Sequence, residues 1–293
     1  MPDQADSRLT VVVITHNRRD QLLATLDRLS RLPERPPVIV VDNASADGTP
    51  EAVSRHHPDV VVLTPGRNLG APGRTLGVRR ARTPYVAFSD DDSWWEPGSL
   101  ARAADLLDRH RRVGLIAAGV RAGPGGADDP LNDVLARSPL GHDDGLPGPR
   151  VLGYLACAAV ARREAYLAAG GYHPLLFIGG EETLLAYDIT ARGWDVCHCP
   201  EVVAVHHPVG GVRPGRPAAQ RRNGVVTAWL RRPLPVALRR TGELAADAWS
   251  DPEARQALRG VLTRLPAALR DRRPLPAPVE DAARRVDAST RTR

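Results

Sequence analysis

The chain has little of what secreted or membrane-spanning proteins need. Its three cysteines cannot form a complete disulfide framework, which is typical of a reducing compartment. The longest uncharged apolar stretch, residues 151–161, has 11 residues, whereas a membrane-spanning helix needs about 20. The apolar run at residues 9–15 is too short for a signal peptide and has the composition of a strand. We therefore expect a cytoplasmic protein, with peripheral attachment to the inner face of the membrane as an alternative.

Lysine is absent, so all 40 basic residues are arginine, and they are unevenly spread. Residues 1–210 carry 22 Arg and 26 acidic residues, whereas residues 211–293 carry 18 Arg and 8 acidic residues. Such an asymmetry suggests an anionic partner for the basic part. An amphipathic, arginine-rich segment suits an anionic membrane surface, but it equally suits a helix that packs on the core. Nucleic acid is not expected as a partner, because no recognised binding module is visible.

The overall composition, 42% hydrophobic and 25% charged, is that of a globular protein and excludes wholesale disorder. Apolar β-branched runs alternate with segments of helical period. Strands are expected at residues 9–15, 38–42, 60–63 and 85–89, and helices at residues 18–31, 47–57, 71–82 and 97–111. Strands that are apolar on both faces and separated by helices indicate an α/β fold, with a mostly parallel sheet flanked by helices.

The rest of the chain is less regular. Residues 123–149, rich in Gly, Pro and Asp, are expected to form a long surface loop. A buried strand at residues 151–161, helices at 163–169 and 181–192, and an extended run at 195–206 should follow. Beyond them, amphipathic helices are expected at residues 221–241, 252–270 and 279–285. We therefore divide the chain into a domain of residues 8–208 and an Arg/Pro-rich, mainly helical extension of residues 209–293.

Acidic side chains follow two of the expected strands. Asp90, Asp91 and Asp92 come directly after a buried strand, and side-chain alternation would place Asp90 and Asp92 on one side. Two carboxylates suit Mg²⁺ or Mn²⁺, which complete their shell with water and substrate phosphate. Asp42 ends the second strand, where a carboxylate can accept hydrogen bonds from a ribose or a base. Each segment by itself is also compatible with a simple turn or helix cap.

Four stretches in this order resemble the family 2 glycosyltransferases, which have the GT-A fold. They are VVITHNR at 12–18, VVDNASADGT at 40–49, RNLG at 67–70 leading to YVAFSDDD at 85–92, and GGY at 170–172 followed by GGEE at 179–182. The resemblance covers residues 8–207. It implies a nucleotide-binding sheet and an enzyme that moves a sugar from a nucleotide-diphosphate sugar to an acceptor hydroxyl. It further implies inversion at the sugar carbon and assistance by a divalent metal.

The resemblance also implies roles for individual residues. The donor-binding residues would be Thr15, Asn17, Asp42, Arg67, Asn68, Arg74, Asp90 and Asp91, with Asp42 on the nucleoside. Mg²⁺ or Mn²⁺ would be held by Asp90 and Asp92, with His206 at the end of the last strand as a further ligand. Cys197 and Cys199 lie near His206, but their spacing does not match that of a structural zinc site.

The catalytic base would come from the acidic pair Glu181-Glu182 at a helix start. By the register of the family's usual Glu-Asp pair, Glu182 is the expected base, and Glu181 is the alternative. A Glu carries one more methylene than an Asp, so the base would reach about 1.5 Å further. Acidic residues are also favoured at helix N-termini for electrostatic reasons alone.

Two other functions compete with sugar transfer. A nucleotidyltransferase would need a Gly-rich, basic loop to hold a triphosphate, and residues 15–20 contain no glycine. A binding module without catalysis would be expected to lose the metal pair or the acidic pair, and both are present. The acceptor is unknown, and a lipid-linked acceptor would suit the basic extension.

Overall fold

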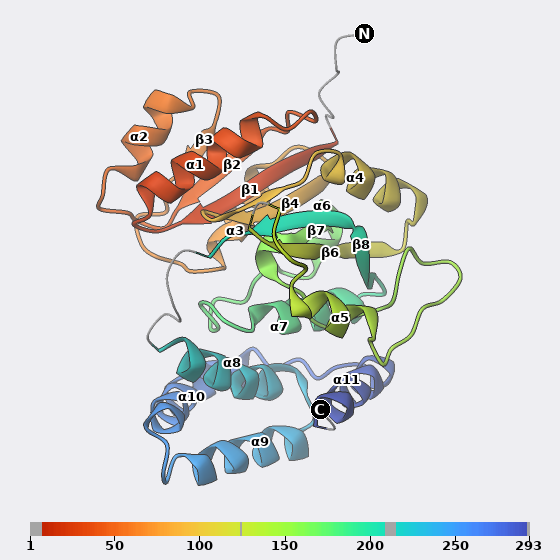
Figure 1. The fold of residues 1–293 in the computed structure, drawn as a ribbon. Helices are drawn as coiled ribbons and strands as arrows, with labels where there is room; N and C mark the ends of the chain where they lie inside the picture. The colour runs from red at the N-terminus through yellow and green to blue at the C-terminus, as the bar shows by residue number, and fades with distance from the viewer. Residues whose placement is uncertain (1–7, 124, 209–214, 292–293) are drawn as a thin grey trace.

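The computed structural model describes residues 8–123, 125–208 and 215–291. In the N-terminal half, four strands pair in parallel in the spatial order β3-β2-β1-β4. They are β1 (Leu9–Thr15), β2 (Val38–Asp42), β3 (Val61–Leu63) and β4 (Tyr85–Asp90), joined by the helices α1 (Arg19–Ser30), α2 (Thr49–His56) and α3 (Gly73–Arg80). The strands and helices predicted for this half are therefore present (Figure 1).

Strand β1 shows why the apolar runs are continuous. All seven of its residues are buried, and they alternate between two cores. Val11 and Val13 belong to the core that contains Leu22 of α1, whereas Val12 packs in the core that contains Val78 of α3. Because helices cover both faces of the sheet, neither face of a central strand can be polar.

Four further strands complete an eight-stranded sheet in the order β3-β2-β1-β4-β7-β6-β8-β5. They are β5 (Ser93–Trp95), β6 (Val113–Ala122), β7 (Ala159–Arg162) and β8 (Asp195–His206), and the helices of this half are α4 (Ser99–Arg109), α5 (Pro130–Ala136), α6 (Arg163–Ala168) and α7 (Glu181–Thr190). Strand β7 is antiparallel to β4 and to β6, and β5 is antiparallel to β8, whereas β6 and β8 run in parallel.

Two predictions for this half are wrong in detail, and β6 was missed. The predicted strand at residues 151–161 is a strand only at Ala159–Arg162, and a 3₁₀ turn at Ala156–Ala158 precedes it. The loop predicted at residues 123–149 contains α5, whose N-terminus is capped by Asp129 accepting from the backbone N–H of Leu131 at 2.8 Å. Strand β6 was not predicted, because its alanines and glycines carry little strand signal and pairing with β7 and β8 determines its conformation.

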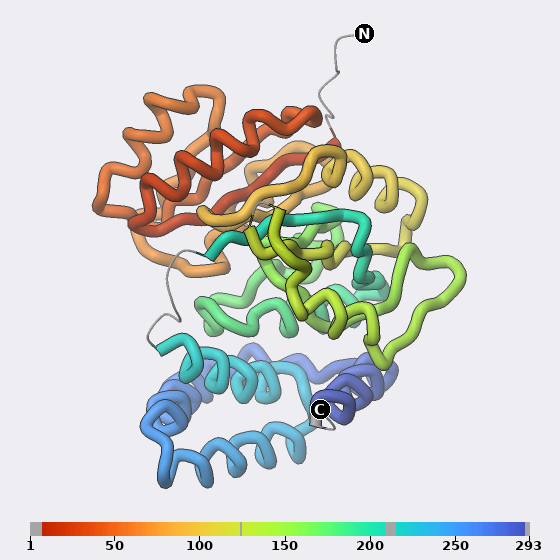
Figure 2. Tube along the Cα trace, viewed as in Figure 1, coloured from red at the N-terminus to blue at the C-terminus, as the bar shows by residue number. Residues whose placement is uncertain are grey.

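The described residues of the extension form four helices: α8 (Arg216–Arg231), α9 (Leu234–Asp247), α10 (Pro252–Arg270) and α11 (Ala277–Arg291). The single helix predicted at residues 221–241 is divided, because a residue before proline avoids the helical conformation and Arg232, before Pro233, is extended at φ −87° and ψ 160°. Figure 2 shows these helices gathered on one side of the sheet. Within the described residues, no helix combines the length and the apolar character needed to span a membrane.

Apolar packing and buried ion pairs attach the extension to the rest of the chain. Val226 and Leu230 of α8 share a core with Leu184 of α7. Beside this core, Arg231 of α8 makes a two-pronged ion pair with Asp188 of α7, with N–O distances of 2.5 and 2.9 Å. Both side chains are 8% exposed, so this pair is part of the interior. Helix α8 of the basic extension therefore packs on the core, which is one of the two alternatives predicted for the extension.

Candidate active site

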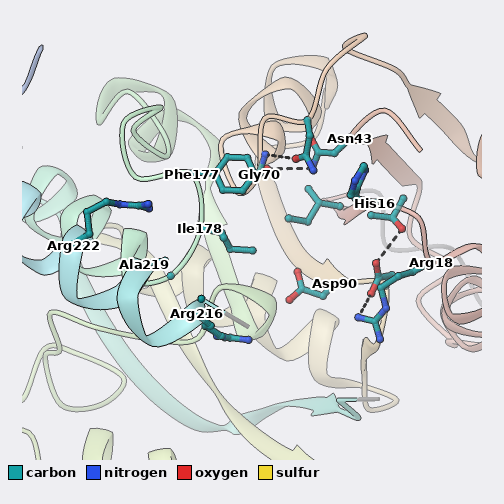
Figure 3. Close-up of a pocket in the computed structure, with 16 residues that line it drawn as sticks. His16, Arg18, Asn43, Gly70, Asp90, Phe177, Ile178, Arg216, Ala219 and Arg222 are labelled. Atoms are coloured by element: carbon teal, nitrogen blue, oxygen red, sulfur yellow. Dashed lines mark hydrogen bonds and ion pairs between the residues drawn. The ribbon is translucent and has the colours of Figure 1, made fainter. Parts of the chain in front are cut away.

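A cleft of about 390 Å³ opens where β1 and β4 end (Figure 3). One wall is formed by the sheet and its loops, with Thr15, Asn43 and Asp90 among its residues. The facing wall consists of residues 177–179 and the first turns of α8. Because parallel strands end at one edge of a sheet, polar residues that are far apart in the sequence meet at this cleft.

The three consecutive aspartates at the end of β4 each have a cationic partner. Asp90 pairs with Arg74 of α3, whereas Nη1 of Arg18 lies 2.8 Å from Oδ1 of Asp91 and 2.8 Å from Oδ2 of Asp92. The side chain of Asp90 is 34% exposed and lines the cleft, while those of Asp91 and Asp92 are 8% exposed. Asp90 is therefore the aspartate most accessible to a ligand.

These neighbours set different pKa values within one short turn. Burial raises the pKa of Asp91 to about 7, against the charge of Arg18. Burial also acts on Asp92, but the neighbouring His206 and the hydrogen bond from Arg18 outweigh it and lower its pKa. His206 in turn has a raised pKa, because its interaction with Asp92 outweighs burial, and its Nε2 lies 3.6 Å from Oδ1 of Asp92.

These residues fit a divalent metal that is only partly coordinated by protein. Among the described residues, no three His, Cys, Asp or Glu side chains converge closely enough to hold a metal on their own. Mg²⁺ and Mn²⁺ sites in phosphate-transferring enzymes commonly use one or two carboxylates and take their other ligands from water and substrate. Asp90 and Asp91 line the cleft and can supply such carboxylates, whereas Asp92 and His206, which pair with each other, are not among its lining residues.

The loops after β1 and β2 form one hydrogen-bonded unit. Asn17, in the left-handed conformation at φ 53°, donates its backbone N–H to Oγ of Ser45 at 2.8 Å, and its Oδ1 accepts from the N–H of Ala46 at 2.7 Å. Asp42 accepts from the N–H of Ser45 at 3.0 Å and from its hydroxyl. Asp42 is buried behind this loop and does not line the cleft, whereas Thr15 does.

Asn43 is a site residue that the sequence reasoning missed. Its Oδ1 accepts from the N–H of Leu69 at 3.1 Å, and its Nδ2 donates to the carbonyl of Gly70 at 3.2 Å. Gly70 has φ +66°, and a Cβ there would lie 2.4 Å from the carbonyl oxygen of Phe177. Asn43 thus fixes the loop that touches the opposite wall, and the adjacent Asp42-Asn43 pair was the available signal.

The predicted residues of that loop and of α3 occupy different places. Asn68 lines the cleft, whereas Arg67 is exposed outside it. Arg74 is 2% exposed, and its Nε has no hydrogen-bond partner among the described residues. Burial opposes the charge on Arg74, but Asp90 outweighs that effect and raises the pKa of the guanidinium. Arg74 therefore lies behind the carboxylates rather than on the cleft surface.

The acidic pair begins α7, after Gly179 and Gly180 at φ +93° and +84°. Glu181 is 2% exposed, and its Oε2 has no hydrogen-bond partner among the described residues. Burial, with the charge of Glu182, raises the pKa of Glu181 to about 8. Burial also raises the pKa of Glu182, which is partly exposed. The charge of Arg74 opposes both shifts.

All three cysteines are buried free thiols. His198, between Cys197 and Cys199, pairs its Nδ1 with the carbonyl of Ala117 at 3.0 Å. Burial raises the pKa of Cys197 to about 12, so a thiolate ligand is disfavoured at neutral pH.

A curled, mostly parallel sheet with this cleft at its strand ends defines the class of GT-A glycosyltransferases. A mannosyltransferase from Pyrobaculum calidifontis, in complex with GDP-Man and Mn²⁺, superposes with a TM-score of 0.58 at 22% identity, covering 99% of this chain and 77% of the other. S. aureus TarS 1–349 in complex with UDP-GlcNAc gives 0.60 at 16% identity, covering 97% and 90%. At these identities the likeness establishes the fold alone.

The sequence comparison establishes the family. Residues 10–168 match the model of glycosyl transferase family 2, so the chain belongs to this family and is a glycosyltransferase. An N-acetylglucosaminyl-diphospho-decaprenol L-rhamnosyltransferase of Mycobacterium tuberculosis is 28% identical over 232 residues, covering 68% of this chain and 76% of the relative. The succinoglycan biosynthesis protein ExoO of Rhizobium meliloti is 32% identical over 103 residues, covering 34% and 30%. The predicted family and fold class are confirmed.

Proposed function

We propose that this glycosyltransferase moves a sugar, with inversion, from a nucleotide-diphosphate sugar to an acceptor hydroxyl with the help of Mg²⁺ or Mn²⁺. One observation carries this proposal. The buried guanidinium of Arg74 pairs with Asp90 and is close enough to act on the charges of Glu181 and Glu182. A carboxylate of the proposed metal site and the acidic pair thus lie near one buried cation, which supports a transfer between two substrates bound close together.

The donor would lie against the sheet wall of the cleft. Thr15 and Asn68, which line the cleft, would contact the nucleoside end, and Asn17, Asp42 and Arg67 would support this wall from outside the cleft lining. Asp90, Asp92 and His206 would hold the metal, with Asp91 supporting the same turn. When bound, the metal screens the negative charge that develops on the leaving nucleoside diphosphate.

Glu182 would act as the general base. Its carboxylate takes the proton of the acceptor hydroxyl while that oxygen attacks the sugar carbon from the side opposite to the leaving diphosphate. Its raised pKa brings it nearer to neutral pH, which makes it a stronger base than an ordinary Glu. Glu181 is the alternative base, although its burial and its pKa of about 8 favour the protonated form.

We also propose a lipid-linked acceptor and a membrane-facing extension. The M. tuberculosis relative is named for a diphospho-decaprenol-linked sugar acceptor. In the present chain, residues 8–208 would form the catalytic domain and residues 209–293 an extension that brings it to an anionic membrane surface. Leu234, Leu238 and Trp249, which are 49, 59 and 92% exposed, support this role because they leave apolar surface uncovered on and after α9.

Metal dependence provides the test of the catalytic proposal. Donor hydrolysis would be measured with UDP-, GDP- and dTDP-sugars, with Mn²⁺ and with excess EDTA. Asp92→Asn keeps the size of the side chain but removes the negative charge of a proposed metal ligand. Activity with the accepted donor should therefore fall at least about 100-fold. Asp59→Asn, at an exposed aspartate outside the cleft, is the matched control.

The opposite results are equally clear. Full activity of Asp92→Asn or of the EDTA-treated enzyme would refute the metal role. Circular dichroism of Asp92→Asn would show whether a loss of activity is instead caused by unfolding. Release of inorganic diphosphate from a nucleoside triphosphate, without sugar transfer, would favour a nucleotidyltransferase instead.

A further inference from the structure

The first turns of α8 contribute two arginines to the cleft, on the wall that faces Asp90. Arg216 and Arg222 line it together with Gly215 and Ala219, because residues at this spacing share one face of a helix. Figure 3 shows Arg216 and Arg222 on α8, across the cleft from Asp90. A segment more than 120 residues beyond the aspartates therefore supplies the positive charge of this wall.

These two guanidinium groups differ from other arginines of α8 in their partners. Arg221 pairs with Asp251 and Arg231 with Asp188, whereas no carboxylate of the described residues lies within ion-pair distance of Arg216 or Arg222. The carboxylates on the opposite wall already have Arg18 and Arg74 as partners. The positive charge of Arg216 and Arg222 is thus not neutralised by a carboxylate within the described part of the chain.

Arg222 is held in place by its surroundings. Its Nη2 donates to the carbonyl of Leu176 at 3.1 Å and its Nε donates to Oδ1 of Asn223 at 2.9 Å, which leaves Nη1 available. Its stem packs on Gly260 of α10, where a Cβ would lie 2.7 Å from Cδ of Arg222. Burial and the nearby charge of Arg264 lower the pKa of Arg222, as expected where like charges gather around an anion site.

The helix end adds to this positive wall. Helix α8 has 16 residues, no acidic residue in its first turn and no side-chain cap at Gly215. The dipole of the helix therefore favours an anion near its first turn, where Arg216 also lies.

We propose that Arg216 and Arg222 bind a phosphate group of the acceptor, a contact that rests on the proposed transfer to a phosphate-bearing, lipid-linked acceptor. The reason for assigning the acceptor rather than the donor is the attachment of this wall. Arg222 and Asn223 bind the carbonyls of Leu176 and Gly179, at 3.1 and 2.7 Å, in the segment that leads into Glu181-Glu182. The proposed base and this phosphate site therefore belong to one hydrogen-bonded wall, whereas the proposed metal and nucleoside residues lie on the other side.

The test uses the full chain and geranyl diphosphate, a short prenyl diphosphate without a sugar, measured by titration calorimetry. Wild type should bind it and should not bind geraniol, its neutral counterpart. Arg216→Gln and Arg222→Gln should each weaken binding about tenfold or more, because each removes a charge-assisted contact to phosphate. Arg221→Gln, a neighbour on α8 that pairs with Asp251, should bind like wild type. Asp90→Asn should also bind geranyl diphosphate normally.

Several results would overturn the proposal. They are the absence of geranyl diphosphate binding, unchanged affinity in Arg216→Gln, and displacement of the probe by a nucleoside diphosphate with Mn²⁺. Arg216 is exposed, so its variant should fold even if that of Arg222 does not. Failure of donor hydrolysis in wild type would instead refute the proposed function, because probe binding requires neither metal nor donor.

Discussion

The acidic side chains around the cleft show how burial and neighbouring cations divide one kind of residue into several. Asp92, beside Arg18 and His206, has a lowered pKa, whereas Asp91, more weakly compensated, has a pKa of about 7. Glu181, buried without a hydrogen-bond partner for its Oε2 in the described structure, has a pKa of about 8. The free-energy cost of burying a carboxylate charge is thus highest where the carboxylate has no direct cationic partner.

Substitution of the acidic pair separates the proposed base from its neighbour. Glu182→Gln keeps the shape of the side chain but cannot accept a proton, so the transfer rate should fall about 10²–10⁴-fold with little change in donor affinity. Glu181→Gln should retain more activity. Steady-state transfer rates and donor binding would be compared for both. A larger loss in Glu181→Gln would move the base to Glu181, and an unaffected rate in both would contradict the inverting mechanism.

Stability against pH gives the same pair a second readout. The folded-state pKa of Glu181, about 8, lies above the ordinary value of 4.5, so the native state binds more protons between these pH values. The protonated Glu181 therefore contributes fully to the free energy of unfolding at low pH, and this contribution is lost as the pH rises toward 8. Glu181→Gln removes this loss, so its stability relative to wild type should rise between pH 5 and 8. Urea unfolding at pH 5, 6.5 and 8 measures this, and a constant difference would contradict the raised pKa.

At the scale of elements, α7 connects the proposed chemistry to the extension. Its first turn carries Glu181 and Glu182. About two turns later, Asp188 forms an ion pair with Arg231 of α8. A carboxylate on a helix does not reveal its partner when that partner lies 43 residues further along.

Removal of one member of this pair should be costly. Asp188→Ala leaves Arg231 buried without a counter-charge, and the free energy of unfolding should fall by about 3–5 kcal/mol. The double variant Asp188→Leu with Arg231→Met should recover most of it, because no charge is then buried. Asp133→Ala, in the exposed pair with Arg137, is the control and should change little. Denaturant unfolding decides, and a loss below about 1 kcal/mol in Asp188→Ala would show that water compensates Arg231.

At the scale of the whole molecule, the basic extension has two kinds of surface. One is internal, where Val225, Val226 and Leu230 pack. In the same interior, Arg231 pairs with Asp188, and Arg232 pairs with Glu280. The other is exposed and includes Leu238 and Trp249. Truncation before Arg221 would uncover the internal surface, so it would test packing rather than membrane attachment.

Surface substitutions test attachment without disturbing the packing. Wild type should co-sediment with vesicles that contain anionic lipid at low salt and less so at high salt, since each arginine near such a surface contributes about 1 kcal/mol that salt screens. The double variant Leu238→Ser with Trp249→Ser should bind more weakly because it removes apolar burial. Val134→Ser, at a 47% exposed residue of α5, is the control. No binding of wild type at low salt would contradict the membrane role.

Much of the fold could be predicted because its signals are local. The apolar run of β1, the helical period of α1 and the aspartates after β4 each lie within a few consecutive residues, and backbone geometry converts such patterns directly into elements. The motifs in these segments sufficed to indicate the family. The boundary between α8 and α9 has a local signal of the same kind, Pro233, but the prediction of one helix over residues 221–241 overlooked it.

Only the tertiary structure decided which distant residues meet. Strand β6, rich in alanine and glycine, is a strand because β7 and β8 pair with it on both sides. Arg74 lies between two acidic centres, and Arg216 and Arg222 face the cleft, because the helices that carry them pack on distant elements. Periodicity records which face of an element is buried, but the partner of that face is set by packing in three dimensions.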